Sequence, residues 1–302
     1  MPGSTSGNST SSRLPFLKLD PNLYGPTREE ADFLKSQTKI ESDEELKQHV
    51  ITVQKEAWDV VNYRCIQNFG FITLKISHQP IYPAFLQLGK ERSGAIYLDF
   101  ACCFGNDVRK AIADGFPVEN AIASDLQGEF WNIGHKLFRS TPETFPVPFI
   151  QGNVLDEKHI SPAPALYDLP TSPRPVLSEL TSLTPLQGHA SAIHVSDFFH
   201  LFRKDDQIQA VRQLASLLSP LPGSMIFGTH SSLPVSSEMK HPMGNFHLYC
   251  FSPEDWCALW DGEIFRKGSV RAEAELIHSP PWRGKDLEKE ARSAMVWSVT
   301  RI

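Results

Sequence analysis

The sequence feature that most constrains the fold is the stretch from Ala95 to Asp107, AIYLDFACCFGND. An apolar run of strand length ends in an acid, passes through a turn of small residues and reaches a glycine followed by Asn106 and Asp107, which can cap a helix. This order predicts a strand, a tight turn and a helix start. In open α/β folds, such a crossing lies at the carboxyl edge of the sheet, where nucleotide-like ligands bind at the positive end of a helix.

The same turn lacks the residues that usually hold phosphates. It does not read Gly-x-Gly-x-x-Gly, and no Gly-Lys-Ser/Thr sequence follows it. Small residues without a phosphate cradle favour an adenosyl ligand that carries no phosphates. The alternative is an ordinary turn between a strand and a helix of a doubly wound sheet.

A second acid-ended strand follows. Asn120 to Leu126 is a short apolar run that ends at Asp125. An acid at the tip of the second strand, roughly 20 residues beyond the first turn, typically binds the ribose hydroxyls of an adenosine ligand. The alternative is that Asp125 only caps the next helix, which is expected over Glu129 to Arg139.

The third expected strand, beginning at Phe149, ends in a polar turn at Gly152 and Asn153. The side-chain carbonyl of Asn153 is a candidate partner for an adenine amino group, and Val154 and Leu155 are candidates for the wall of the ring. Alternatively, Asn153 occupies the turn for its own backbone reasons.

The fourth expected strand, Ser191 to Ser196, continues into Asp197 to Phe202, which holds three phenylalanines and one histidine. Aromatic residues at a ligand edge build an apolar pocket, and His200 is a candidate to orient or deprotonate a bound molecule. The alternative is that the phenylalanines pack in the core and the histidine is structural.

The chain divides into three segments. Residues 1–13 are rich in Ser, Thr and Gly and are predicted to be disordered. Residues 14–90 are predicted to be helical, with a capping box at Thr27 and a second helix from about Ser42. This region either closes over the cleft as a lid or packs on the back of the sheet. Residues 91–302 are expected to form the main α/β domain.

The second half of that domain completes the predicted sheet. Six prolines between Ser161 and Pro185 predict a surface loop that ends in a short helix, Val176 to Leu183. The loop that contains His241 is expected to reach over the site. The other expected elements are a helix over Asp205 to Leu218, a fifth strand over Gly223 to His230, a loop over Met239 to Phe246, a helix opened by Ser252 and Pro253, and a final antiparallel pair over Val270 to Ile277 and Ser293 to Ile302.

The composition argues against several classes of protein. No stretch approaches the roughly 20 apolar residues that span a bilayer, and Met1 to Ser12 lacks an apolar signal segment, so a soluble protein is expected. Five irregularly spaced cysteines favour free thiols in a reducing cytoplasm and no metal site. A net charge of −6 without a basic cluster argues against a nucleic-acid partner. A small-molecule substrate is expected, and a homodimer is left open.

Taken in order, these features resemble a class I S-adenosylmethionine-dependent methyltransferase, a doubly wound, mostly parallel seven-stranded fold with an antiparallel edge. The sequence is similar to that of a fungal group of small-molecule methyltransferases in three segments, Leu98 to Lys110, Gly134 to Arg139 and His194 to Phe202. Members of that group serve meroterpenoid and related secondary-metabolite pathways, and several convert a carboxylic acid to its methyl ester. The resemblance extends from about Tyr24 to Ile302.

The resemblance implies a set of site residues. Asp99 and the backbone of the following turn face the methionine part of S-adenosylmethionine, Asp125 and Leu126 hold the ribose and adenine side, and Asn153 and Val154 the adenine. The turn residues of that set are Ala101, Cys102, Cys103 and Gly105, and Ser196 completes it; Phe198, Phe199 and His241 are the implied substrate contacts. Two residues depart from the wider class, since Ala101 replaces a glycine and Asn153 replaces an aspartate.

The implied reaction is O-methylation, of a carboxylic acid ahead of a hydroxyl group. A carboxylate is ionised at pH 7 and needs no base. A hydroxyl group benefits from one, and His200 is the candidate, with His230 or His241 behind it. A fold that has lost methyl transfer and acts as a cyclase, a pericyclic catalyst or a non-catalytic partner remains the alternative. A dinucleotide-binding oxidoreductase is disfavoured because its glycine fingerprint is absent.

Overall fold

The computed structural model describes residues 18–240, 247–278 and 293–302. The predicted tail at residues 1–13 and the predicted substrate contact His241 lie outside these residues.

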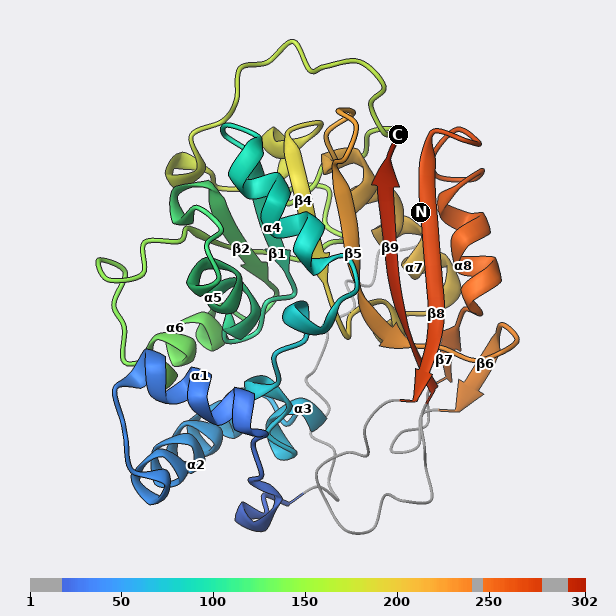
Figure 1. Cartoon of the computed structure of the whole chain (residues 1–302). Helices are drawn as coiled ribbons and strands as arrows, with labels where there is room; N and C mark the ends of the chain where they lie inside the picture. The colour runs from blue at the N-terminus through green and yellow to red at the C-terminus, as the bar shows by residue number, and fades with distance from the viewer. Residues whose placement is uncertain (1–17, 241–246, 279–292) are drawn as a thin grey trace, which may run out of the picture.

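A seven-stranded sheet in the order β3-β2-β1-β4-β5-β9-β8 forms the centre of the molecule (Figure 1). Strands β1 to β5 run parallel to one another, and β9 pairs antiparallel with both β5 and β8. The bounds are β1 Ile96–Phe100, β2 Ala121–Asp125, β3 Phe149–Gln151, β4 Ala190–Val195, β5 Met225–Ser231, β8 Val270–His278 and β9 Ser293–Arg301. The predicted doubly wound sheet with its antiparallel edge is confirmed.

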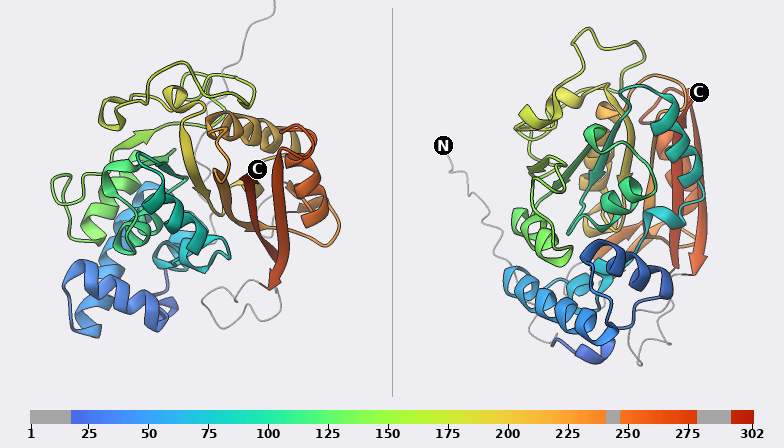
Figure 2. Two further views of the ribbon diagram at one scale, coloured as in Figure 1. Left: turned by 45° about the horizontal axis from the view of Figure 1, so that its top comes forward. Right: turned by 60° about the vertical axis from the view of Figure 1, so that its left-hand side comes forward.

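Helices cover both faces of this sheet, as the two further views show (Figure 2). The helices of the main domain are α4 Tyr82–Glu91, α5 Asn106–Ala113, α6 Gly128–Leu137, α7 Lys204–Leu217 and α8 Pro253–Trp260. Strand β1 shows how the two faces divide. Ile96 and Leu98 pack in the cluster that includes α7 and α8, whereas Tyr97 packs with α4 and α5. A strand buried on both faces reads as a continuous apolar run, which is what the sequence shows there.

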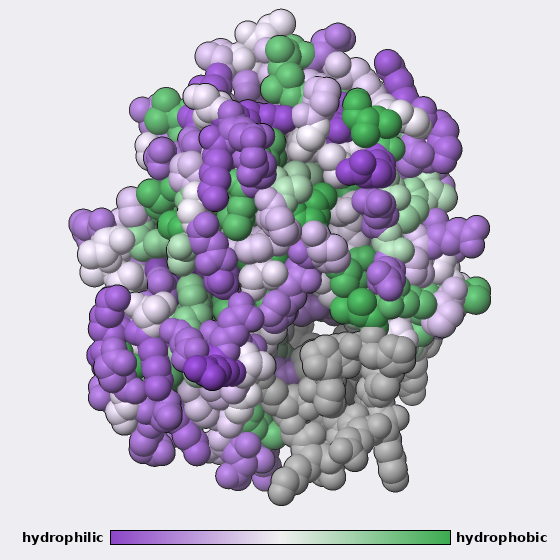
Figure 3. Space-filling model, in the orientation of Figure 1, coloured by the Kyte–Doolittle hydropathy of each residue, from purple (hydrophilic) through white to green (hydrophobic). Residues whose placement is uncertain are grey.

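Three N-terminal helices, α1 Arg28–Thr38, α2 Asp43–Val60 and α3 Arg64–Gln67, lie at the end of the sheet where the parallel strands finish (Figure 1). The predicted capping box is present: the Thr27 amide donates to Glu30 Oε2 at 2.7 Å, and the Glu30 amide donates to Thr27 Oγ1 at 3.2 Å. The face of these helices seen in Figure 3 is mainly hydrophilic.

The inner face of the N-terminal helices shares a hydrophobic cluster with α6. Leu46 and Val50 of α2 belong to the same cluster as Phe130 and Leu137 of α6, and Phe104 of the turn after β1 joins them. The N-terminal region therefore packs firmly beside the carboxyl edge of β1 and β2.

Two local predictions differ from the structure. The helix predicted over Val176 to Leu183 is wrong, because only the short 3-10 turn at Leu177–Glu179 forms there. A helix that short is marginal by itself, and the Leu183 amide instead donates to the His159 carbonyl at 2.9 Å. The loop predicted over Met239 to Phe246 begins later, because residues before it pair in a small hairpin, β6 Ser237–Lys240 with β7 His247–Cys250.

The remaining short elements are 3-10 turns, η1 Pro21–Leu23, η2 Gly70–Ile72, η3 Ile76–His78, η4 Val118–Asn120, η6 Thr184–Leu186 and η7 Phe199–Leu201. No helix in the described part of the chain combines the length and the apolar character needed to cross a membrane.

Candidate active site

The turn after β1 and the residue two positions after β4 have unusual backbone conformations. Ala101, Cys103 and Asp197 have φ of 56°, 53° and 52°, and they are three of the six non-glycine residues with positive φ in the described ranges. Each such residue costs about 1–2 kcal/mol relative to a right-handed conformation. Backbone strain of this kind concentrates at functional sites, so the carboxyl edge of β1 and β4 is the first place to look for one.

Within that turn, some residues serve its shape. Gly105 begins α5 with φ of 71°, and a Cβ at this position would lie 2.6 Å from the Trp131 ring, so only glycine fits. Cys102 is buried, and its amide donates to the Ser124 carbonyl at 3.2 Å. The half-buried residues of the turn are Ala101 and Cys103.

Asp125 ends β2 opposite this turn, and backbone amides orient its carboxylate. Oδ2 accepts from the Cys103 amide at 2.8 Å, and Oδ1 accepts from the Gln127 amide at 2.9 Å. Burial raises the pKa of the carboxyl group above its usual value, although the two amides oppose this shift. Gln127 is the N-cap residue of α6, so this bond forms a turn just before the helix, and no side-chain hydrogen bond within the described residues caps α6. Each carboxylate oxygen keeps a further lone pair for a ligand hydroxyl.

Exposed apolar side chains lie close to this carboxylate. Leu126, the next residue along, is 50% exposed, and Tyr63, from the N-terminal region, is 41% exposed. The Tyr63 side chain hydrogen-bonds that of Gln127, two residues beyond Asp125. Exposed large apolar residues beside a fixed carboxylate suit a ligand with an aromatic base and a ribose.

Asp99, by contrast, lies inside the protein. It is 1% exposed, Oδ2 accepts from the Val108 amide at 3.1 Å, and Oδ1 accepts from His194 Nδ1 at 2.8 Å. Because a carboxylate only accepts, Nδ1 of His194 donates to Asp99, and Nε2 of the same ring hydrogen-bonds Ser196 Oγ at 2.8 Å. Ser196 Oγ in turn accepts from the Thr229 amide at 3.2 Å.

This buried chain ties together the carboxyl ends of β1, β4 and β5 and the first turn of α5. Both oxygens of Asp99 bond to protein groups, and Ser196 is 8% exposed. In this structure Asp99 and Ser196, which the resemblance assigns to the cofactor, hydrogen-bond to other protein groups and support the carboxyl edge of the sheet from beneath.

The β3 side of the edge is simpler. Asn153 is exposed, and its side-chain oxygen accepts from the Leu155 amide at 3.0 Å, which is the turn geometry considered as the alternative. Val154 is 2% exposed and packs in the main core cluster, while Leu155 is half-buried beside it.

Beyond β4, the aromatic segment is divided between core and edge. Phe199 is fully buried, with its ring 5.0 Å from that of Trp256. Phe198 is 9% exposed and meets Phe100 edge-on at 5.2 Å. His200 is half-buried in η7. Burial acts to raise the pKa of the nearby Asp197 carboxyl, but Lys75 and, to a smaller extent, His200 lower it.

His230, which was a reserve candidate for a base, lies in the core. It is 1% exposed, and its ring faces those of Phe199 and Trp256 at 5.5 and 4.6 Å. Burial, helped by the charge of His200, lowers the pKa of His230 to about 3, so its imidazole is neutral at pH 7.

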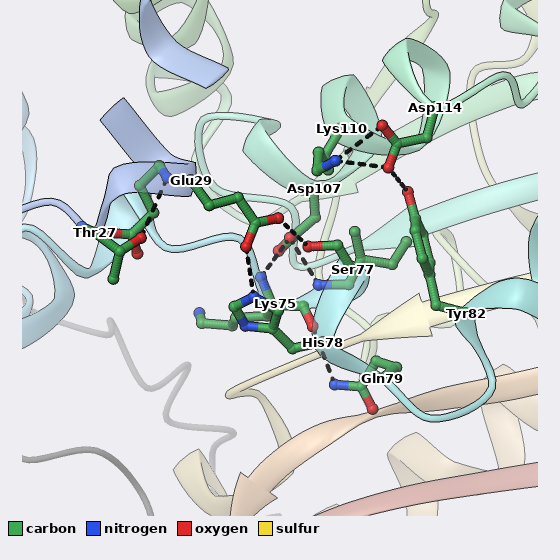
Figure 4. Close-up of polar contacts among 12 residues, drawn as sticks. Thr27, Glu29, Lys75, Ser77, His78, Gln79, Tyr82, Asp107, Lys110 and Asp114 are labelled. Carbon is green, nitrogen blue, oxygen red and sulfur yellow. Dashed lines mark hydrogen bonds and ion pairs between the residues drawn. The ribbon is translucent and has the colours of Figure 1, made fainter. Parts of the chain in front are cut away.

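The sequence analysis missed Lys75. Its ammonium pairs with Asp197 Oδ2 at 2.8 Å, and the two side chains are 26% and 48% exposed. The backbone around it is fixed, because the amides of Lys75 and Ile76 both donate to Asp107 Oδ1, at 2.8 and 3.0 Å. Figure 4 shows this segment between Asp107 on α5 and Glu29 on α1, whose carboxylate pairs with His78 at 2.9 Å. Lys75 is a single lysine in a connecting segment, and nothing in the sequence around it indicates an ion pair with Asp197.

A cysteine from the same N-terminal region also reaches the turn. Cys103 hydrogen-bonds to Cys65, and this bond, together with burial, raises the pKa of the Cys103 thiol well above its usual value. Cys103 is therefore a neutral thiol at pH 7. All five cysteines are free. No group of three or more His, Cys, Asp or Glu side chains in the described ranges could hold a metal ion.

Comparison with known proteins gives matches over most of the chain. A family model described as the meroterpenoid methyltransferase N-terminal domain matches residues 19–72. The O-methyltransferase atr3 of Stereocaulon alpinum is 30% identical over 89% of this chain and 68% of its own length. The O-methyltransferase phiE of a fungal species is 31% identical over 80% of this chain and 72% of its own. The asnovolin E/chermesin D methyltransferase nvfJ of Aspergillus novofumigatus is 32% identical over 81% and 77%.

Among solved structures, the 1,6-didemethyltoxoflavin-N1-methyltransferase of Burkholderia thailandensis, crystallised with S-adenosylhomocysteine, aligns over 92% of this chain and 91% of its own, with a TM-score of 0.46 and 12% identity.

Proposed function

The chain belongs to the fungal methyltransferase family represented by atr3, phiE and nvfJ, and from this premise we propose that it transfers a methyl group from S-adenosylmethionine to an oxygen of a small secondary metabolite, preferably a carboxylate. One observation carries the assignment of the site. The Asp125 carboxylate is held by the backbone of the strained turn after β1, at the carboxyl edge of a β3-β2-β1-β4-β5-β9-β8 sheet.

The residues at this edge fit an adenosyl sulfonium. Asp125 offers acceptors for two ribose hydroxyls, and the exposed side chains of Leu126 and Tyr63 offer apolar surface for the adenine. Asp125 adds a carboxylate to the edge, whereas the charge of Asp197 is paired with Lys75. A carboxylate beside the turn disfavours the phosphates of a dinucleotide.

When bound, S-adenosylmethionine supplies an electrophilic methyl group on a positively charged sulfur. The protein's own task is then to hold the acceptor oxygen in line with that methyl group and to exclude water. Asp125 fixes the ribose end, while Phe198 and Phe202 give apolar surface on the acceptor side. The buried Asp99–His194 pair keeps the ends of β1 and β4 in register beneath them.

A carboxylate acceptor is preferred because it needs no general base. A carboxylic acid with a pKa of about 4 is ionised at pH 7, so positioning alone suffices. His230 is buried with a pKa of about 3. His200, half-buried beside Asp197, is the described histidine that can serve a hydroxyl acceptor.

Two measurements test the proposal. Calorimetry with S-adenosylhomocysteine should show binding to the wild-type protein and at least a tenfold loss in Asp125→Asn. Incubation with a labelled methyl donor and matched pairs of aromatic and terpenoid acids and alcohols should label the acids. If neither the donor nor its demethylated product binds, the assignment is refuted. Binding without transfer to any acceptor would instead favour the cyclase or non-catalytic alternative.

The same proposal includes the setting of the reaction. Five free cysteines suit a reducing cytoplasm, and the net charge of −6 argues against a nucleic-acid partner. Whether the protein works as a monomer or a homodimer is measurable by light scattering at micromolar concentration.

A further inference from the structure

The amino-acid end of the cofactor needs a binding site that Asp99 does not provide. An α-amino acid is a zwitterion at pH 7, with an ammonium and a carboxylate on one carbon atom. Both oxygens of Asp99 are engaged inside the protein, by His194 and by the Val108 amide. An accessible pair of opposite charges at the same edge would match such a zwitterion.

We propose that Lys75 and Asp197 form this site, with the Lys75 ammonium binding the α-carboxylate and the Asp197 carboxylate binding the α-ammonium. The inference rests on the proposed function and extends it to the residues that recognise the methionine end. Without ligand the two side chains pair with each other at 2.8 Å. On binding, each exchanges its partner for the matching group of the zwitterion.

The position of the pair along the edge supports this assignment. Asp125 ends β2, the strained turn follows β1, and Asp197 follows β4, so these three points lie on successive strands of the sheet. Neighbouring strands are about 4.8 Å apart, which puts Asp197 about 10 Å from Asp125, with the turn between them. In the opposite direction, toward β3, lie the apolar residues Leu126 and Val154, and an apolar surface suits the adenine base. The charged end of the ligand thus lies toward β4.

Both residues are held in place by groups other than their partner. The Lys75 amide donates to Asp107 on α5, and Gln79, four residues on, donates to Thr229 Oγ1 at 2.7 Å. The Asp197 amide donates to the Thr229 carbonyl at 2.6 Å in the left-handed conformation that aspartate tolerates better than most residues. The pair therefore keeps its position when its mutual contact is exchanged.

Both charges are present at neutral pH. Burial acts to raise the pKa of the Asp197 carboxyl, but the charge of Lys75, with His200 beyond it, holds that pKa below its usual value. Burial acts to lower the pKa of Lys75, and Asp197 and Asp107 together raise it. Two charge-assisted bonds to a zwitterionic ligand would take the place of the bond between the two side chains.

The test compares two ligands that differ only at this end. S-adenosylhomocysteine carries the amino-acid group, and 5′-methylthioadenosine has the same adenosyl thioether without it. In calorimetry, Lys75→Met and Asp197→Asn should each weaken S-adenosylhomocysteine roughly 10- to 100-fold, and should change methylthioadenosine affinity less than about threefold. Lys75→Arg keeps the charge and should stay within about fivefold of wild type.

Two further variants serve as controls. Lys110→Met removes another partly buried, paired lysine, bonded to Asp114 at 2.7 Å, and should leave both affinities unchanged. Asp125→Asn should weaken both ligands alike. Thermal melting of each variant checks that it is folded.

Several results would overturn the inference. Equal weakening of both ligands in Lys75→Met and Asp197→Asn would mean that the pair only shapes the pocket. Unchanged S-adenosylhomocysteine affinity with a raised KM for the acceptor would assign Lys75 to the substrate instead. If the wild-type protein binds neither ligand, the proposed function itself fails, and this inference fails with it.

Discussion

Replacing Asp99 tests whether this residue supports the edge from beneath or contacts the cofactor. In Asp99→Ala, the Val108 amide and Nδ1 of His194 both lose their acceptor at a site that is 1% exposed. An unsatisfied buried donor costs about 1–3 kcal/mol, so the two together cost about 2–6 kcal/mol. Asp99→Asn keeps one acceptor oxygen but turns an N–H toward one of the two donors, and about 1–3 kcal/mol is expected.

Urea unfolding followed by tryptophan fluorescence measures these losses, because Trp256, Trp260 and Trp297 are all buried in the folded protein. Total stabilities of proteins are about 5–15 kcal/mol, so Asp99→Ala should shift the midpoint strongly. Adding His194→Leu to Asp99→Ala removes one of the orphaned donors. The double variant should therefore lose less stability than the sum of the two single ones.

The affinity of Asp99→Asn for S-adenosylhomocysteine tests the other possibility, that Asp99 contacts the cofactor. Asp99→Asn, once folded, should bind S-adenosylhomocysteine within about threefold of wild type, because its side chain faces protein groups. If Asp99→Asn unfolds at the wild-type urea concentration but loses more than about tenfold in affinity, Asp99 contacts the cofactor and the reasoning from its burial is refuted.

Three other predictions follow from the site and its surroundings. Because φ of Ala101 is 56°, Ala101→Gly should relieve about 1 kcal/mol of backbone strain and raise the urea midpoint, whereas the β-branched Ala101→Val should lower it. Equal urea midpoints would exclude strain there. His230 has a pKa of about 3 in the folded protein and about 6.5 in the unfolded chain, so the protein loses stability as the pH falls from 6.5 toward 3. At pH 5 the loss is about 2 kcal/mol. Urea titrations at several pH values should show that this loss is absent in His230→Phe. Burial raises the pKa of Asp125, and its ionised form accepts best, so S-adenosylhomocysteine affinity should begin to fall at a higher pH than for an ordinary aspartate, a trend that calorimetry should find missing in Asp125→Asn.

Local chemistry made much of the fold predictable. Apolar runs that end in acids marked β1 and β2, and the spacing of Thr27 and Glu30 marked the start of α1. The antiparallel edge followed from the two runs near the C-terminus. The short hairpin of β6 and β7 was not predicted. Its strands are held by pairing with each other, and they show no alternation of apolar and polar residues that would have indicated a strand.

The sequence offers a site prediction where a single residue ends a strand. Asp125 was predicted in that way as a ribose contact and this role stays a prediction, while the structure places its carboxylate against the turn. Asp99 looked equivalent, since both acids end a strand, but its partner His194 is distant in sequence and turns it inward. Lys75 reaches Asp197 only through the path of the whole N-terminal region, so no local pattern could reveal that contact.

The hydrophobic cluster that α1 and α2 share with α6 bears on whether the N-terminal region can be exchanged between relatives. Phe33 and Val50 of the N-terminal region pack with Phe130 and Leu137 of the main domain, so neither side is complete alone. Grafting residues 19–72 from a relative should therefore give insoluble hybrids unless the matching face of α6 is transplanted too.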